Sequence, residues 1–141
     1  MRTIGNILWL VLAGWWLALL YVLAGVLACV LIITIPFGIA SFRIAGYALW
    51  PFGRTIVLSG TAGLPSLIGN IIWIVLFGWG LFLGHLFSGL LLMITIIGIP
   101  FGIASIRLAV VALIPLGTRI VDVRDAVVPS YSREPVPAGR R

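Results

Sequence analysis

Charge is almost absent from this chain. All nine basic residues are arginine, there is no lysine, and only three residues are acidic, so 9% of the 141 residues are charged while 62% are hydrophobic. Soluble domains are roughly one-quarter charged. No charged residue lies between Arg2 and Arg43, or between Arg54 and Arg107. This composition excludes a water-soluble fold and indicates an integral membrane protein.

Groups that carry chemistry are equally scarce. The chain has one histidine and one cysteine, and its three acids all follow position 121. A metal site needs several such ligands together, and nucleophilic catalysis needs a base beside the nucleophile. We therefore expect no enzyme, no metal and no cofactor. We interpret the net charge of +6 as a sign of membrane topology and of anionic lipid headgroups as partners, with no nucleic acid.

The apolar sequence occurs twice. A shift of 64 positions aligns GNILWLVLAGWW with GNIIWIVLFGWG, IPFGIASFRIA with IPFGIASIRLA, and ALWPFGRTIV with ALIPLGTRIV, without a gap. Such self-similarity indicates the duplication of one unit, and it governs the fold. The two units run from Gly5 to Val57 and from Gly69 to Val121. Asn6 and Asn70 open the units, where we expect them to cap helix starts.

Each unit is too long for a single span. The run from Thr3 to Phe42 is about 40 residues, which as an α-helix would extend roughly 60 Å, twice the thickness of the hydrocarbon core. Two spans per unit fit better, with turns near residues 21–25 and 84–89. All membrane-proximal arginines then lie on one side, as the positive-inside rule requires.

The predicted fold is therefore all-α, with four transmembrane helices in two tandem parallel hairpins and both termini cytoplasmic. Long tilted or re-entrant helices stay open as an alternative, because Trp15 and Trp16 fall toward mid-span in the hairpin scheme and tryptophan prefers interfaces. The expected segments are a first membrane repeat over 1–58, a cytoplasmic linker over 59–66, a second repeat over 67–122, and a polar, disordered tail over 123–141.

The most distinctive motif is IPFGIAS, present from Ile35 and again from Ile99. Proline inside an apolar helix removes a backbone donor, so we expect the return helices to kink or break at the prolines, with the nearby glycines loosening the same turn. Such interruptions at matching places can mark a binding site or simply shape helix packing. The residues concerned are Pro36, Gly38, Pro100 and Gly102.

Arginines and small residues complete the candidate sites. Arg43 and Arg107 follow the two motifs, either reaching lipid headgroups or forming a positive ring around an opening between subunits. Arg54 is a weaker candidate, because Thr118 occupies its aligned position. Small residues spaced four apart allow close helix packing within hairpins or between protomers. The pairs are Ser41 and Ala45, Ser105 and Ala109, and Gly80 and Gly84.

The motifs GNIxWxVLxGW, IPFGIASxR and ALxPxGxxIV, each present twice, resemble the YccF family of bacterial inner-membrane proteins. The resemblance covers nearly the whole chain apart from the tail. It implies an inner-membrane domain in two copies with four spans. It implies no settled activity and transfers no catalytic residue.

Two functional hypotheses follow from this architecture. The first is a small homo-oligomeric channel that favours anions, because a duplicated glycine-rich bundle encloses no pathway unless several subunits surround one. The second is a non-conducting membrane scaffold that gathers anionic lipid through its arginines. Selective current through liposomes distinguishes the first from the second.

Overall fold

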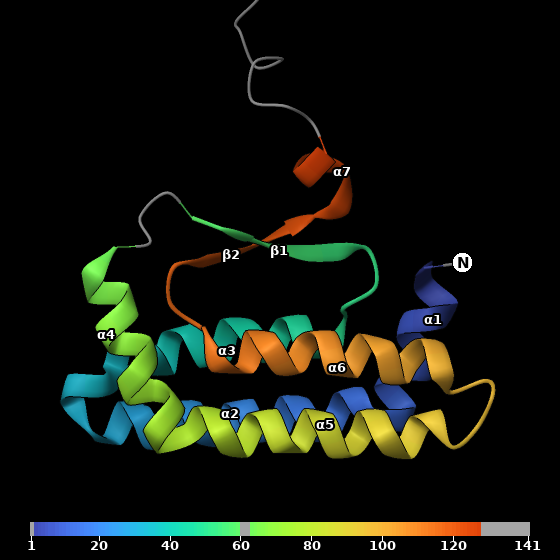
Figure 1. Ribbon diagram of the computed structural model, residues 1–141, viewed down its shortest axis with the longest axis horizontal. Coiled ribbons are helices and arrows are strands. Elements are labelled where there is room, and N and C mark those ends of the chain that lie inside the picture. Colours follow the sequence, from blue (N-terminus) through green and yellow to red (C-terminus); the bar gives the residue numbers. More distant parts are fainter. Residues whose placement is uncertain (1, 60–62, 128–141) are drawn as a thin grey trace, which may run out of the picture.

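The computed structural model describes residues 2–59 and 63–127, which form two helical hairpins and a small sheet (Figure 1). In the first repeat a helix runs without interruption through α1, a π-helical segment η1 and α2, and a 3₁₀ turn η2 leads into the return helix α3 and strand β1. The bounds are Arg2–Trp9 for α1, Leu10–Gly14 for η1, Trp15–Val30 for α2, Ile32–Thr34 for η2, Ile35–Leu49 for α3 and Arg54–Leu58 for β1.

The second repeat follows the same plan. Its long helix again contains a π-helical segment, and its strand is followed by a short helix, α7. The bounds are Leu64–Trp73 for α4, Ile74–Gly78 for η3, Trp79–Met93 for α5, Ile99–Leu113 for α6, Thr118–Asp122 for β2 and Val123–Val127 for α7. Three helices, Arg2–Val30, Ile32–Leu49 and Leu64–Met93, are long and apolar enough to cross a membrane, and α6 is an apolar helix of shorter length.

The hairpin turns lie later than the sequence predicted. Residues 21–25 belong to α2 and residues 84–89 to α5, so the chain reverses only at η2 and at residues 94–98. The reason is that the glycines expected to make the turns serve helix packing. A side-chain carbon on Gly25 would come within 2.8 Å of the Phe42 ring on α3, and one on Gly89 would meet the Gly102 carbonyl oxygen at 3.1 Å.

The prolines begin the return helices and do not kink them. Pro36 and Pro100 are each the second residue of their helix. In the first turn a backbone N–H has no partner within the helix, so proline costs nothing there and its fixed φ suits the helix. Gly38 and Gly102 likewise do not loosen a turn. They bring the helices together, since an added Cβ would stand 2.8 Å from the Gly25 oxygen or 2.6 Å from the Gly89 oxygen.

Serine hydroxyls join the two helices of each hairpin. Ser41 Oγ donates to the Tyr21 carbonyl oxygen at 2.6 Å, and Ser105 Oγ donates to the His85 oxygen at 2.8 Å. Both serines are fully buried, as are Ala45 and Ala109 one turn further on. These small residues therefore lie inside the hairpins, between α2 and α3 and between α5 and α6.

The two hairpins point in opposite directions, which corrects the predicted parallel arrangement. Figure 1 shows the turn between α2 and α3 at one end of the molecule and the turn between α5 and α6 at the other. Strands β1 and β2 pair antiparallel, and Ile56 faces Ile120, its counterpart 64 positions later. Tyr21 and its counterpart His85 also touch, with ring centroids 5.6 Å apart. An approximate two-fold axis therefore passes through the sheet and between α2 and α5.

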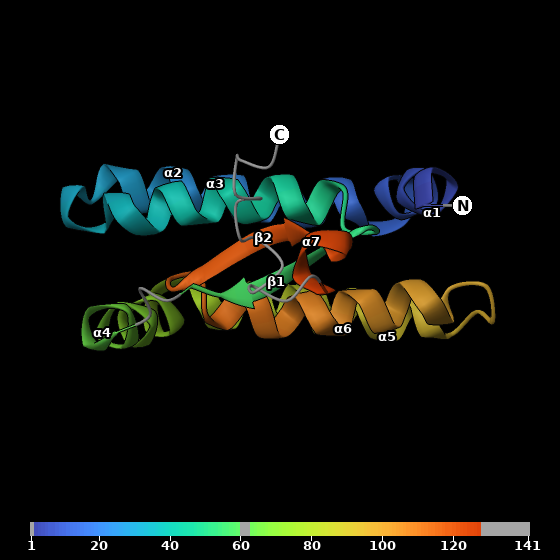
Figure 2. The ribbon, with the colours of Figure 1, turned by 90° about the horizontal axis from the view of Figure 1, so that it is seen from above.

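The sheet lies on one side of the helices. Figure 1 shows it next to α3 and α6, with α2 and α5 beneath them, and Figure 2 shows the strands crossing over the space between the hairpins. The all-α prediction therefore missed two strands, although the chain is mostly helical as expected. Of the predicted disordered tail, residues 123–127 form α7, and 128–141 lie outside the described residues. The predicted linker is shorter, because α4 begins at Leu64.

Alanine substitution at two glycines tests the helix contact. Gly38→Ala forces α3 away from the Gly25 oxygen, and we expect it to destabilise the fold by about 1–3 kcal/mol, the usual cost of overpacking. The matched control is Gly80→Ala, because no atom of the described residues lies within 4 Å of an added Cβ there. Unfolding midpoints in detergent micelles measure both. Equal midpoints for the two variants would contradict the packing described here.

Candidate functional site: two pockets that join the repeats

The loop that follows each return helix forms one wall of the site. In ALWPFG and ALIPLG the chain leaves the helix, passes a buried proline and turns into a strand. The turn ends at Gly53, with φ of 100°, and at Gly117, with φ of 77°. Side chains other than glycine rarely adopt such angles. The glycine therefore allows the loop to fold back over its own repeat.

Two buried asparagines fix these loops. Asn6 Nδ2 donates to the Phe52 carbonyl oxygen at 2.9 Å, and Asn6 Oδ1 accepts from the Phe52 N–H at 2.9 Å. Asn70 makes the same pair of bonds with Leu116, at 3.1 and 3.0 Å. The predicted capping role is therefore wrong. Each amide satisfies the backbone of a loop 46 residues away, because that loop has no regular secondary structure to pair with.

Tryptophan holds the last turn of each return helix. Trp9 Nε1 donates to the Ala48 oxygen at 2.6 Å, and Trp73 Nε1 donates to the Ala112 oxygen at 2.8 Å. The π-helical segment begins directly after each tryptophan and ends at a glycine. At Gly14 an added Cβ would stand 2.7 Å from the Trp9 indole nitrogen. The glycine therefore leaves the room in which the indole lies.

The phenylalanine of each IPFG motif reaches the other repeat. Phe37 stacks on Trp73, with centroids 6.0 Å apart and an interplanar angle of 17°. Phe101 meets Phe52 edge to face at 5.6 Å. The start of each return helix is thus fixed against the loop or the long helix of the opposite repeat. This contact places IPFGIASxR of one repeat beside the PxG loop of the other.

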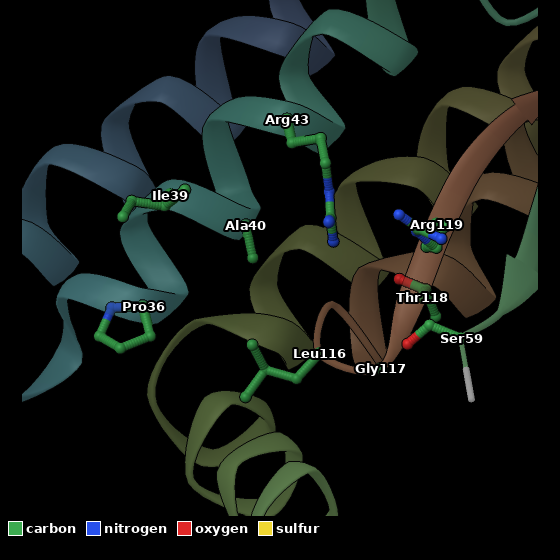
Figure 3. A pocket seen from close by; sticks show the side chains of 9 residues that line it. All are labelled: Pro36, Ile39, Ala40, Arg43, Ser59, Leu116, Gly117, Thr118 and Arg119. Carbon is green, nitrogen blue, oxygen red and sulfur yellow. The ribbon is translucent and has the colours of Figure 1, made fainter. Parts of the chain in front are cut away.

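The first pocket lies at this junction and has a volume of about 400 Å³. Arg43 extends from α3 toward the opposite wall, and its Nη2 donates to the Pro115 carbonyl oxygen at 3.1 Å. Arg119 lies on that wall, on strand β2 (Figure 3). Helix α3 contributes Pro36, Ile39, Ala40 and Arg43, and the other wall consists of Leu116, Gly117, Thr118, Arg119 and Ser59.

The second pocket is the counterpart of the first. Its volume is about 340 Å³, and α6 and the loop of the first repeat form its walls. Its arginines are Arg107 on α6 and Arg54 on β1. Seven of its lining residues are 64 positions from lining residues of the first pocket, so the two pockets are one site that occurs twice. They are Pro100, Ile103, Ala104, Arg107, Phe52, Gly53 and Arg54.

Both pockets are positively charged. Among residues 2–59 and 63–127 no acidic residue lines either pocket, and all four arginines are exposed. Asp122 is the last residue of β2 and stands opposite Arg54 in the strand pair. Its carboxylate lies 3.9 Å from Arg2, and it borders a third pocket together with Arg43 and Arg54. Guanidinium groups in such a setting bind anions, and phosphate best matches their fork of donors.

The sequence candidates are thus separated in space. Arg43 and Arg107 lie in different pockets, and a strand arginine lines each pocket with them, Arg119 in the first and Arg54 in the second. Arg54 and Arg119 are not aligned between the repeats, yet each supplies one pocket. The pairing of the two strands brings both arginines to the pockets, and the sequence alone gives no sign of that pairing. A Cβ added at Gly84 would stand 3.1 Å from the Leu20 side chain of the other hairpin, whereas one added at Gly80 would meet no atom of the described residues within 4 Å.

The single histidine is part of the core. His85 Nε2 lies 3.1 Å from the Tyr21 hydroxyl and Nδ1 lies 3.4 Å from Ser105 Oγ, on or near the two-fold axis. No carboxylate is among these partners. Within residues 2–59 and 63–127, no three potential ligands are grouped to hold a metal ion. His85 therefore joins the two hairpins through hydrogen bonds.

Comparison with known proteins assigns the two repeats to the same type of domain. The YccF inner membrane component domain matches twice, over residues 4–54 and 68–118. The chain belongs to the YccF family. It is similar to "Inner membrane protein YccF" of Escherichia coli (strain K12) and of Shigella flexneri, each 38% identical over 138 residues, covering 89% of this chain and 91% of the relative. No solved structure matches.

The family match confirms the predicted inner-membrane protein with an internal repeat. Each matched segment starts before the asparagine and ends at the turn into the strand, so it contains one asparagine, one tryptophan, one IPFG motif and one PxG loop. The names of the relatives state a location and no reaction.

Removing one asparagine tests how the pocket wall is held. Asn6→Ala leaves the N–H and the carbonyl of Phe52 without partners, and we expect a loss of about 2–4 kcal/mol in unfolding free energy. Thr3→Ala, on the exposed side of the same helix, is the control and should change stability by less than about 0.5 kcal/mol. Denaturant unfolding in micelles provides the comparison. A stable, unchanged Asn6→Ala variant would contradict the loop assignment.

Proposed function

We propose that this YccF protein binds the phosphate groups of anionic membrane lipids in its two pockets and so organises such lipids in the inner membrane, without conducting ions. The observation that carries the proposal is the pairing of a helix arginine with a strand arginine in each pocket, with no acid among the described residues that line the two pockets. Both pockets are complete within one chain. Binding therefore does not require assembly.

The arginines are suited to a phosphate ester. A guanidinium presents several N–H donors in one plane. Arg43 uses one of them on the Pro115 oxygen, which fixes its position while the others remain available for a ligand. A phosphate held between Arg43 and Arg119 would receive charge-assisted bonds from both repeats. The same holds for Arg107 and Arg54 in the second pocket.

The apolar walls favour a lipid as the source of that phosphate. Pro36 and Ile39 line the first pocket beside Arg43, and both side chains are exposed at the surface of α3. Pro100 and Ile103 take the same places on α6. A free phosphate gains nothing from such a wall, whereas a phospholipid lays its glycerol and upper acyl chains against it.

The oligomeric channel is supported less well. A positive ring around a subunit interface would need Arg43 and Arg107 to face a neighbouring chain, whereas Arg43 is bonded to the second repeat of its own chain. The two arginines also belong to separate pockets. Ion flux is therefore an outcome to be tested.

Lipid selectivity tests the proposal. The purified chain in neutral detergent is titrated with phosphatidylglycerol, with phosphatidylcholine and with inorganic phosphate, and bound lipid is counted by native mass spectrometry. We expect a preference for phosphatidylglycerol that falls roughly tenfold in Arg43→Gln/Arg107→Gln, since each arginine removes a charged hydrogen bond. The control is Arg124→Gln, an exposed arginine outside both pockets.

Three results would count against the proposal. Unchanged lipid selectivity in the double variant would mean that Arg43 and Arg107 take no part in binding. An equal loss in Arg124→Gln would mean that net charge alone attracts the lipid. Inorganic phosphate that competes as well as lipid would make the ligand a soluble anion.

Liposomes test the non-conducting part separately. Vesicles that contain the protein should hold a chloride gradient as well as empty vesicles do, because no pore is needed for headgroup binding. A selective current that changes in Arg43→Gln/Arg107→Gln would instead establish the channel hypothesis.

A further inference from the structure

The sheet and most of the described charged residues lie on one side of the molecule, at one end of the two-fold axis. Strands β1 and β2 lie on the α3 and α6 side of the molecule, away from α2 and α5 (Figure 1). Arg43 and Arg107 line pockets together with residues of these strands or of the loops before them. Arg2 pairs with Asp122 at the end of β2. One face of the molecule is therefore polar.

The hairpin turns have the opposite character. Their side chains are aliphatic or threonine, with Ile33 92% and Ile96 86% exposed. The threonine hydroxyls are bonded inside the turns: Thr34 Oγ1 donates to the Leu31 oxygen at 2.7 Å, and Thr95 Oγ1 lies 3.2 Å from the Leu92 oxygen and accepts from the Gly98 N–H at 3.1 Å. Turns that pair their own polar groups and expose isoleucine suit hydrocarbon better than water.

An orientation with the hairpins along the membrane normal conflicts with both observations. Arg43 stands eight residues after the start of α3 and six before its end, so it and its counterpart Arg107 would lie near mid-depth. The two-stranded sheet beside them has open edges, which do not occur in contact with lipid inside a bilayer. Charged side chains at that depth are costly. In addition, the apolar turns would protrude into water at both ends.

We propose that the protein lies within one leaflet, with its two-fold axis along the membrane normal. The sheet and the arginines then lie at the cytoplasmic headgroup level, α3 and α6 lie just below, and α2 and α5 face the bilayer centre. The hairpins extend sideways, and their turns are surrounded by acyl chains. The partner of the α2 and α5 surface is thus the hydrocarbon of one leaflet.

The shape of the long helices agrees with this orientation. Figure 1 shows α1 and α4 rising toward the sheet side while α2 and α5 run along the hairpins. The change of direction occurs around the π-helical segments η1 and η3, and such segments are a known cause of kinks. Helices that are long enough to cross a bilayer are therefore bent, and each one begins at the polar face and then turns along the membrane plane.

Cysteine accessibility tests the orientation. In a Cys29→Ser background, single cysteines at Ile33→Cys, Ile96→Cys and Arg124→Cys are exposed to a membrane-impermeant maleimide, first in intact cells, then in inside-out vesicles, and finally in detergent. We expect Arg124→Cys to react in inside-out vesicles and the two turn cysteines to react only in detergent. Val30→Cys and Ile97→Cys, which are also strongly exposed, replace a turn variant that does not fold.

Two other results would overturn the proposal. Reaction of both turns in intact cells would mean that both hairpins cross the membrane in the same direction. Reaction of one turn in cells and the other in vesicles would mean inverted repeats with the two-fold axis in the membrane plane. Neither result depends on which anion the pockets bind, so this test fails or succeeds independently of the lipid titration.

Discussion

The antiparallel pairing of β1 with β2 is the constraint on which the rest of the structure depends. Each strand pairs with its own counterpart, and Ile56 meets Ile120 at the centre. A strand can meet its own copy antiparallel only if the two repeats are related by a two-fold axis through that point. The opposite directions of the hairpins, the contact of Tyr21 with His85 and the two equivalent pockets all follow from this relation.

The repeated motifs gain a physical meaning from the same relation. Within each repeat, asparagine holds the loop and tryptophan holds the end of the return helix. Between repeats, the phenylalanine of IPFG places the arginine helix against the other loop. Neither repeat contains a complete pocket alone. Each pocket therefore takes its second wall from the other copy of the repeat. The arginine that follows IPFGIAS in one repeat lines a pocket together with the loop of the other repeat.

Much of the architecture could be predicted from the sequence. The repeat, the two helices per unit and the scarcity of residues that could catalyse a reaction or bind a metal can all be read from the sequence itself. The strands could not be predicted, because RTIVL and TRIVD continue an apolar run and are stabilised by a partner 64 positions away. The turns were misplaced because Gly25 and Gly89 occur in a helix contact that only the folded hairpin reveals. Arg54 and Arg119 were undervalued for the same reason, since each comes to line a pocket only through the folded arrangement of the strands.

The central claim is that the two repeats meet at a two-fold axis through Ile56 and Ile120. Its most direct test is a disulfide between Ile56→Cys and Ile120→Cys in a Cys29→Ser chain, because directly opposed antiparallel residues lie within the Cα separation that a disulfide needs. Mass spectrometry of the oxidised protein in membranes should find this link within one chain, and should find none for Ile56→Cys with Ile33→Cys. A protein that forms no Ile56–Ile120 link, or links only between separate chains, would contradict the account.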